Sequence, residues 1–86
     1  MIPRREERDR MVRPVYIEGR QHGTYSALSI DVSECGLCLV TNVDINPGDT
    51  LTVYSKHIWP EPRTAVAVWK TRVVSESSRV GLSFCH

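Results

Sequence analysis

The chain alternates apolar and polar positions in short runs, which is the pattern of β-strands that bury one face. Residues 12–18 and 24–32 alternate in this way on either side of a polar turn at residues 20–23. Four further runs rich in β-branched and aromatic residues occupy positions 37–41, 50–57, 64–74 and 79–85. The best helical window, residues 3–11, is charged on every side. The pattern therefore predicts six short strands and no stable helix.

Glycine and proline mark the connections between these runs. Asn46-Pro47-Gly48-Asp49 is a strong turn signal, residues 59–63 carry two prolines and are expected to form a loop, and Gly36 marks a tight corner. Six short strands in so small a chain favour a closed antiparallel β-barrel over a sandwich, because closure removes the exposed edges. We expect a six-stranded barrel over residues 12–86 with a flexible arm at residues 1–11.

Length and composition limit the chain to one small domain. It has 86 residues, of which 41% are hydrophobic and 24% are charged, as in an ordinary globular domain. No apolar run approaches the roughly 18 residues that cross a bilayer, and the charged N-terminus does not resemble a secretory signal. These features predict a soluble cytoplasmic protein with no membrane insertion.

Arginine is concentrated at the start of the chain. The net charge is only +1, yet nine of the eleven basic residues are arginine. The planar guanidinium can grip a phosphate or a guanine with two parallel hydrogen bonds, whereas an isolated basic terminus is often merely solvated. Five arginines fall within the first thirteen positions: Arg4, Arg5, Arg8, Arg10 and Arg13.

The three cysteines, Cys35, Cys38 and Cys85, are expected to be small buried apolar residues. Their odd number and the absence of a secretory signal disfavour a disulfide framework. Cys35 and Cys38 form a C-x-x-C pair, but strand positions three apart point to opposite faces, which is unsuitable for two ligands of one zinc ion. No metal site or cofactor is therefore predicted.

A second candidate cluster is the D-x-S-x-x-G motif formed by Asp31, Ser33 and Gly36, between the second and third predicted strands. In an extended segment Asp31 and Ser33 point to the same side, so a carboxylate and a hydroxyl lie next to each other. Gly36 has no Cβ, which allows a sharp turn and the close approach of a flat ligand. Taken alone, the motif is more typical of a simple turn.

The order of these motifs resembles that of the PilZ domain family, receptors for cyclic diguanylate. The resemblance covers nearly the whole chain and includes an R-x-x-x-R pair before Pro14-Val15, the D-x-S-x-x-G motif and a Pro-Gly turn before the fourth strand. Trp69 in the fifth strand and the ending Val80-Gly81-Leu82-Ser83-Phe84 also match. Two departures are Cys35, where many members have glycine, and the missing C-terminal helix.

The resemblance implies cyclic diguanylate as ligand and assigns roles to five residues. Arg4 and Arg8 would clamp the ligand from the arm, since arginine pairs with phosphate and with guanine O6 and N7. Asp31 would accept hydrogen bonds from a guanine edge, Ser33 would add a further hydrogen bond, and Gly36 would provide clearance.

Three further residues are secondary candidates. Arg5 and Arg10 flank the arginine pair and are able to reach phosphate, and Trp69 either stacks on a base or is simply an aromatic residue of the barrel wall. On this interpretation the ligand orders the arm and thereby changes the surface offered to a downstream protein partner.

Three other functions fit the sequence less well. A PilZ-like interaction module that does not bind the nucleotide is the alternative, although such modules usually lack the arginine pair. Binding of DNA or RNA is disfavoured, because few aromatic residues and a net charge of +1 do not make a basic groove. An enzyme is also disfavoured: Asp31, Ser33 and His22 supply the residue types of a triad, but no nucleophile elbow accompanies the serine.

Overall fold

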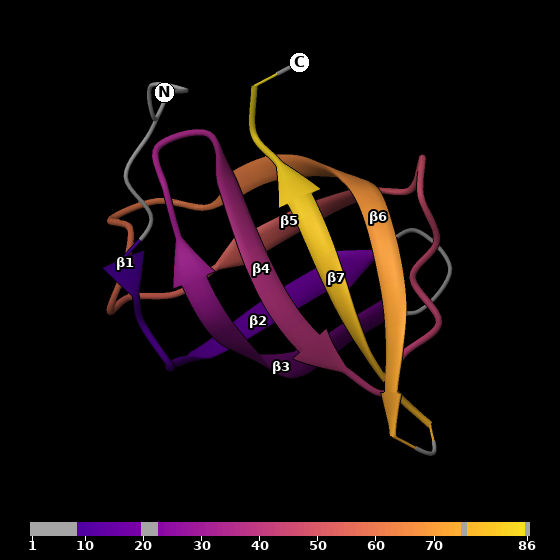
Figure 1. The fold of residues 1–86 in the computed structure, drawn as a ribbon. Helices are drawn as coiled ribbons and strands as arrows, with labels where there is room; N and C mark the ends of the chain where they lie inside the picture. The colour runs from indigo at the N-terminus through magenta and orange to yellow at the C-terminus, as the bar shows by residue number, and fades with distance from the viewer. Residues whose placement is uncertain (1–8, 20–22, 75, 86) are drawn as a thin grey trace, which may run out of the picture.

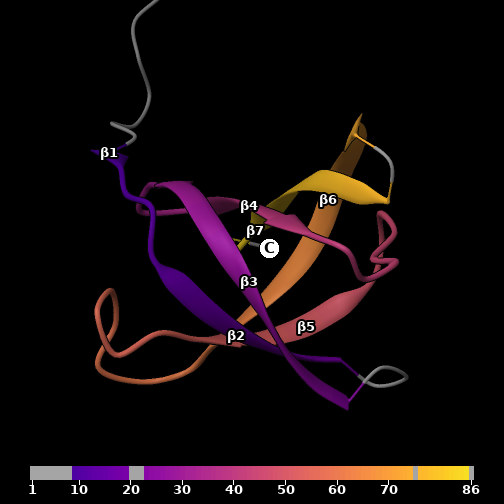
Figure 2. The ribbon, with the colours of Figure 1, turned by 90° about the horizontal axis from the view of Figure 1, so that it is seen from below.

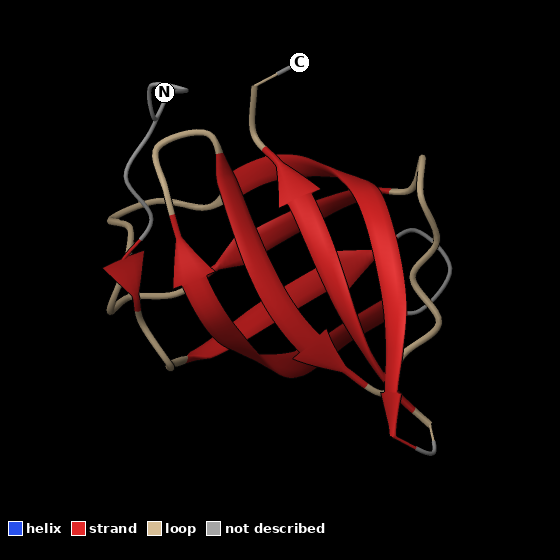
Figure 3. Cartoon of the chain, viewed as in Figure 1, coloured by secondary structure: helices blue, strands red, loops and turns tan. Residues whose placement is uncertain are grey.

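The alternating segments fold into strands over almost their full predicted lengths. The computed structural model describes residues 9–19, 23–74 and 76–85, and within them the chain forms strands and loops but no helix (Figures 1 and 3). In that part of the chain, therefore, no helix is long and apolar enough to cross a membrane. The strands are β1 (Asp9–Arg10), β2 (Pro14–Gly19), β3 (Gly23–Val32), β4 (Gly36–Thr41), β5 (Thr50–Tyr54), β6 (Arg63–Val74) and β7 (Ser77–Ser83).

The sheet closes on itself into an antiparallel barrel. Neighbouring strands follow the order β1-β3-β2-β5-β6-β7-β4, and β4 also pairs with β3. Six strands, β2 to β7, thus complete the closed ring seen from below in Figure 2, which confirms the predicted six-stranded barrel. The two-residue strand β1 was not expected; it pairs with the end of β3.

The core is made of the inward-facing side chains of all six barrel strands. Each strand contributes one or two aliphatic residues, and the loop after β4 adds Ile45, which is fully buried. The long loop before β6 packs Ile58 and Trp59 against this cluster. The buried members are Val15, Ile17, Ala27, Leu37, Leu39, Ile45, Leu51, Val53, Ala65, Ala67, Val80 and Leu82.

Backbone hydrogen bonds explain where two predicted connections begin and end. The turn at residues 46–49 is confirmed: the Asp49 amide donates to the Asn46 carbonyl at 3.0 Å, and Gly48 adopts a φ of 100°, which favours glycine. The strand expected over residues 50–57 stops earlier, at Tyr54. The Ser55 carbonyl instead accepts from the amides of Ile58 and Trp59, so the chain turns there.

The expectation that the cysteines form no disulfide is wrong, because Cys35 and Cys85 are joined by one. Strands β4 and β7 are antiparallel neighbours in which Gly36 pairs with Ser83, so the residue before β4 and the residues after β7 meet. Cys35 and Cys85 occupy these two positions, with 5.3 Å between their Cα atoms. Cys38 is buried, as expected.

We predict that Leu39→Ala lowers the free energy of unfolding by about 2–5 kcal/mol, since Leu39 is fully buried and its truncation leaves a cavity. Leu28→Ala is the matched control, because Leu28 on the adjacent strand β3 is 51% exposed, and we expect a change within about 0.5 kcal/mol. Urea-induced unfolding measures both. Equal losses would contradict the assignment of inner and outer faces.

Candidate functional site

The strand register aligns five residues in one row across the outer wall of the barrel. Arg10 pairs with Asp31, Asp31 with Cys38, Cys38 with Gly81, and Gly81 with Trp69. Directly opposed residues of antiparallel strands share a face, and neighbouring strands lie about 4.8 Å apart, so the row spans about 19 Å. We call Arg10, Asp31, Cys38, Gly81 and Trp69 the outer row.

The neighbouring positions fix which face the outer row occupies. Val32 packs against the core, and it pairs with Leu37 of β4, which is fully buried in the core. Side chains alternate along a strand, so Asp31, one residue before Val32, points away from the core. Asp31 is half-buried, and Arg10 and Trp69 are exposed at the two ends of the row.

Trp69 lies flat on the barrel wall because its neighbour is glycine. A Cβ atom on Gly81 would lie 2.2 Å from the indole Nε1 of Trp69, so only glycine leaves room for the ring. The indole is still 43% exposed, which leaves an aromatic surface open to solvent at this end of the row. Trp69 is therefore an aromatic residue of the barrel wall, which is one of its two roles expected from sequence. Its exposed face leaves the other role, stacking on a base, a prediction.

Arg10 and Asp31 form the polar end of the outer row. They are directly opposed on β1 and β3, which places a guanidinium and a carboxylate of opposite charge beside each other. The sequence indicates Asp31 as a ligand-binding residue and Arg10 only as a secondary candidate. The strand register places the two residues opposite each other. Arg4, Arg5 and Arg8 lie outside the described residues, so their place relative to the row stays a prediction.

The D-x-S-x-x-G motif forms the end of β3, a three-residue loop and the start of β4. The Ser33 amide donates to the Gly36 carbonyl at 2.9 Å, and the Ser33 hydroxyl donates to the same oxygen at 3.4 Å. Ser33 is only 6% exposed, so its hydroxyl supports the turn as well as being a candidate for the ligand. The corner itself consists of Glu34 and Cys35, and Gly36 is the first residue of β4.

Ser29 is a positioning residue that the motif analysis missed. It is 1% exposed at an inward position of β3, where its hydroxyl accepts a hydrogen bond from the Arg13 amide at 2.9 Å and donates to the Met11 carbonyl. The Met11 amide donates to the Ile30 carbonyl at 2.9 Å. The sequence did contain one signal for this role, because Ser29 is a polar residue at a core-facing position of an alternating strand.

These bonds hold the chain from Asp9 to Arg13 along β3. The sequence assigned residues 1–11 to a flexible arm, yet residues 9–11 are hydrogen bonded to the barrel. The register between β3 and β4 shifts between Ser29 and Asp31, so a bulge at this point accompanies the attachment. The bulge lies immediately before the candidate ligand-binding carboxylate.

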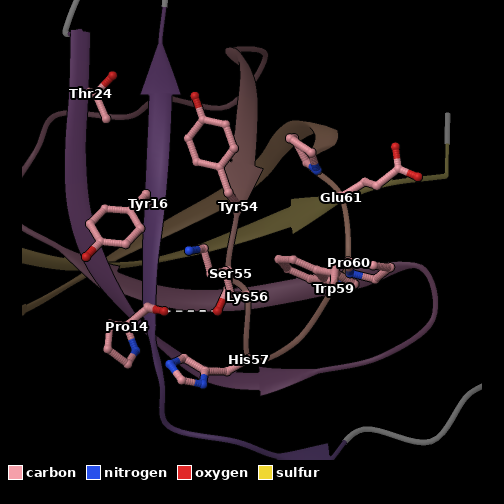
Figure 4. Close-up of a pocket in the computed structure, with 11 residues that line it drawn as sticks. Pro14, Tyr16, Thr24, Tyr54, Ser55, Lys56, His57, Trp59, Pro60 and Glu61 are labelled. Atoms are coloured by element: carbon pink, nitrogen blue, oxygen red, sulfur yellow. Dashed lines mark hydrogen bonds between the residues drawn. The ribbon is translucent and has the colours of Figure 1, made fainter.

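A separate cleft of about 660 Å³ opens on the outer face of β2 and β5, beneath the loop that leads into β6 (Figure 4). The Tyr54 hydroxyl at its edge donates to the Glu18 carboxylate at 2.6 Å, and this hydrogen bond raises the pKa of Tyr54. The cleft contains none of the residues proposed from sequence and no arginine. Its lining residues are Pro14, Tyr16, Thr24, Tyr54, Ser55, Lys56, His57, Trp59, Pro60, Glu61 and Pro62.

The described residues offer no metal centre. Within residues 9–19, 23–74 and 76–85, no group of three or more histidine, cysteine, aspartate or glutamate side chains converges. The outer row instead combines a cation, a carboxylate and an aromatic surface, which suits the recognition of a flat heterocyclic anion by hydrogen bonding and stacking.

The chain is a small closed all-β barrel that carries a polar and aromatic row on its outer wall. Comparison with known families identifies it: the profile of the PilZ domain matches residues 3–86, and the chain belongs to this family. PilZ domains are non-catalytic receptor domains for cyclic diguanylate.

One solved structure shows the same fold. The chain is similar to the inhibitor of motility from Bacillus subtilis, with a TM-score of 0.74 and 19% sequence identity. The match covers 100% of this chain and 44% of that protein, so this chain spans less than half of its length. No match was found among the curated proteins.

We predict that Ser29→Ala lowers the free energy of unfolding by about 1–3 kcal/mol, because the Arg13 amide and the Met11 carbonyl both lose a buried partner. Amide hydrogen exchange at residues 11–13 should become faster. The control is Ser26→Ala, an exposed serine of the same strand, which should change neither quantity. Unchanged exchange in Ser29→Ala would show that the hydroxyl does not hold this segment.

Proposed function

We propose that this domain binds cyclic diguanylate on the outer row and clamps it with Arg4 and Arg8. The single observation that carries the proposal is the register that aligns Arg10, Asp31 and Trp69 on one face. Membership of the PilZ family supports the choice of ligand. The inhibitor of motility supports the fold only.

The chemistry of the ligand matches the groups along the row. Each guanine offers N1 and N2 donors to the Asp31 carboxylate, and its O6 and N7 acceptors and the two phosphodiesters suit arginine. Trp69 offers a surface on which a purine can stack. Ser33 and Gly36 contribute the compact turn that keeps Asp31 accessible, and Arg5 is a further candidate for a phosphate.

The attachment of residues 9–13 to β3 bears on the response to the ligand. Because this stretch is already hydrogen bonded to the barrel, the ligand does not have to order it. Fewer residues to order means a lower entropic cost, at about 1–2 kcal/mol each. We propose that the ordered arm presents a new surface to a downstream protein partner in the cytoplasm. An affinity in the micromolar to submicromolar range follows.

The cleft on the outer face of β2 and β5 does not favour a second function. It contains a lysine, a histidine and a glutamate but no arginine, so it does not present the paired guanidinium forks that suit two phosphodiesters. The alternative is that the domain acts only as a protein-interaction module. Titration with cyclic diguanylate, described next, distinguishes this alternative from the proposed receptor.

We predict that Arg8→Ala and Asp31→Ala each weaken the binding of cyclic diguanylate at least tenfold, because each removes a hydrogen-bonding partner of the ligand. Isothermal titration calorimetry measures the affinity, and the melting temperature of the ligand-free domain reports on its stability. Glu34→Ala is the control: Glu34 is an exposed acid of the same turn that lies outside the row. Wild-type affinity in both variants would refute the site, and no binding by the wild type would favour the interaction module.

We predict that Trp69→Ala weakens binding about 5- to 150-fold, the range that corresponds to loss of one base stacked on an aromatic residue. Trp59→Phe serves as the control, since Trp59 lines the cleft away from the row. Fluorescence of the Trp59→Phe variant, in which Trp69 is the remaining tryptophan, should change on titration. Undiminished binding in Trp69→Ala would leave the residue with a structural role alone.

A further inference from the structure

The Cys35–Cys85 disulfide connects the D-x-S-x-x-G turn to the end of the described chain. Cys35 lies in the two-residue corner between Ser33 and Gly36, and its bridge reaches a residue 50 positions away in sequence. The Phe84 amide also donates to the Cys35 carbonyl at 2.8 Å. In Figure 1 this corner and the C-terminal tail lie at the same end of the barrel.

The two ends of the bridge have different surroundings. The tail is held beside Cys85 by Phe84, whose ring meets Trp59 edge-to-face at 5.3 Å and lies 4.0 Å below the Arg63 guanidinium. The corner is held by the Ser33–Gly36 hydrogen bonds and by Phe84. The disulfide is thus the covalent connection between an anchored tail and a short polar corner.

The bridge is accessible, whereas the third cysteine is not. Cys85 is exposed and Cys35 is half-buried, so a small thiolate can approach the Cys85 sulfur. Cys38, which belongs to the outer row, is only 3% exposed. Disulfides are unusual in cytoplasmic proteins, and those that occur there typically exchange with other thiols. With the cytoplasmic location expected from sequence, the Cys35–Cys85 bond belongs to this exchangeable class.

We propose that the Cys35–Cys85 disulfide is a thiol-exchange site whose redox state sets the affinity of the outer row for cyclic diguanylate. This inference rests on the proposed function. The bridge restricts the corner that follows Asp31, so in the oxidised form the ligand meets a turn that is already ordered. In the reduced form the ligand has to order the turn itself, and the affinity falls.

The exchange requires a dithiol as its reductant. A dithiol thiolate attacks Cys85 Sγ, the Cys35–Cys85 bond breaks, and the Cys35 thiolate leaves and takes up a proton. The second thiol of the reductant then displaces Cys85 from the mixed disulfide. Two electrons and two protons pass to the protein, which gains two thiols, and the dithiol becomes a cyclic disulfide.

The experiment compares the oxidised and the dithiothreitol-reduced wild-type domain. Calorimetric titration with cyclic diguanylate should show binding at least threefold weaker in the reduced form. Alkylation after denaturation should find one thiol of three in the oxidised form and three in the reduced form. Cys85→Ser should reproduce the reduced affinity without any response to dithiothreitol. The control Ser26→Ala, at an exposed serine of β3 outside the row, should keep the response.

Amide hydrogen exchange at residues 33–36 supplies a second readout that needs no ligand, and we expect it to be faster after reduction. Equal affinity of the two redox forms, where both bind, would overturn the inference. So would equal exchange rates in the two forms. If neither form binds the ligand but amide hydrogen exchange is still faster after reduction, the proposed function is contradicted. The thiol-exchange site itself would still be supported in that case. A circular dichroism spectrum of Cys85→Ser checks that the unbridged chain is folded.

Discussion

Strand β3 is paired along both of its edges, and the other features of the molecule depend on this double pairing. One edge carries β2 along its first part and β1 at its end, and the other edge carries β4, which closes the barrel. The bulge between Ser29 and Asp31 lets β3 serve both edges, because it shifts the register with β4 just where β1 attaches. Closure therefore delivers the N-terminal segment, the D-x-S-x-x-G turn and the wall of β4 to one region.

The outer row follows from strand pairing rather than from any single motif. Its members come from five strands, β1, β3, β4, β7 and β6, and the four pairings between these strands bring the first and the last into one line. Gly81 illustrates the dependence: its missing side chain matters only because Trp69 lies opposite it on β6. A receptor built in this way needs its inner packing intact, although none of the inner residues has to touch the ligand.

Local patterns predicted the barrel and most of the strands, since alternation and turn residues are local signals. The resemblance to the PilZ family pointed to Asp31, and secondarily to Trp69, as site residues. It did not reveal their alignment, because a register across four strand pairs depends on how the strands pair in the sheet. The disulfide was missed for a related reason. Counting cysteines ignores that Gly36 pairs with Ser83, and this pairing alone brings Cys35 to Cys85. The role of Ser29 likewise depends on which backbone atoms lie beside it.

The two connections that meet near the site differ in how easily they are reversed. Residues 9–13 are held to β3 by hydrogen bonds, each worth about 1 kcal/mol net, so this connection opens and closes on the timescale of local fluctuations. The Cys35–Cys85 bond closes a loop of 50 residues and is worth about 4 kcal/mol in the chain-entropy account. It changes only by chemical exchange. The first connection thus responds to local fluctuations and the second to a reductant. Both join β3 next to Asp31, because Asp31 pairs with Arg10 and precedes the bridged corner.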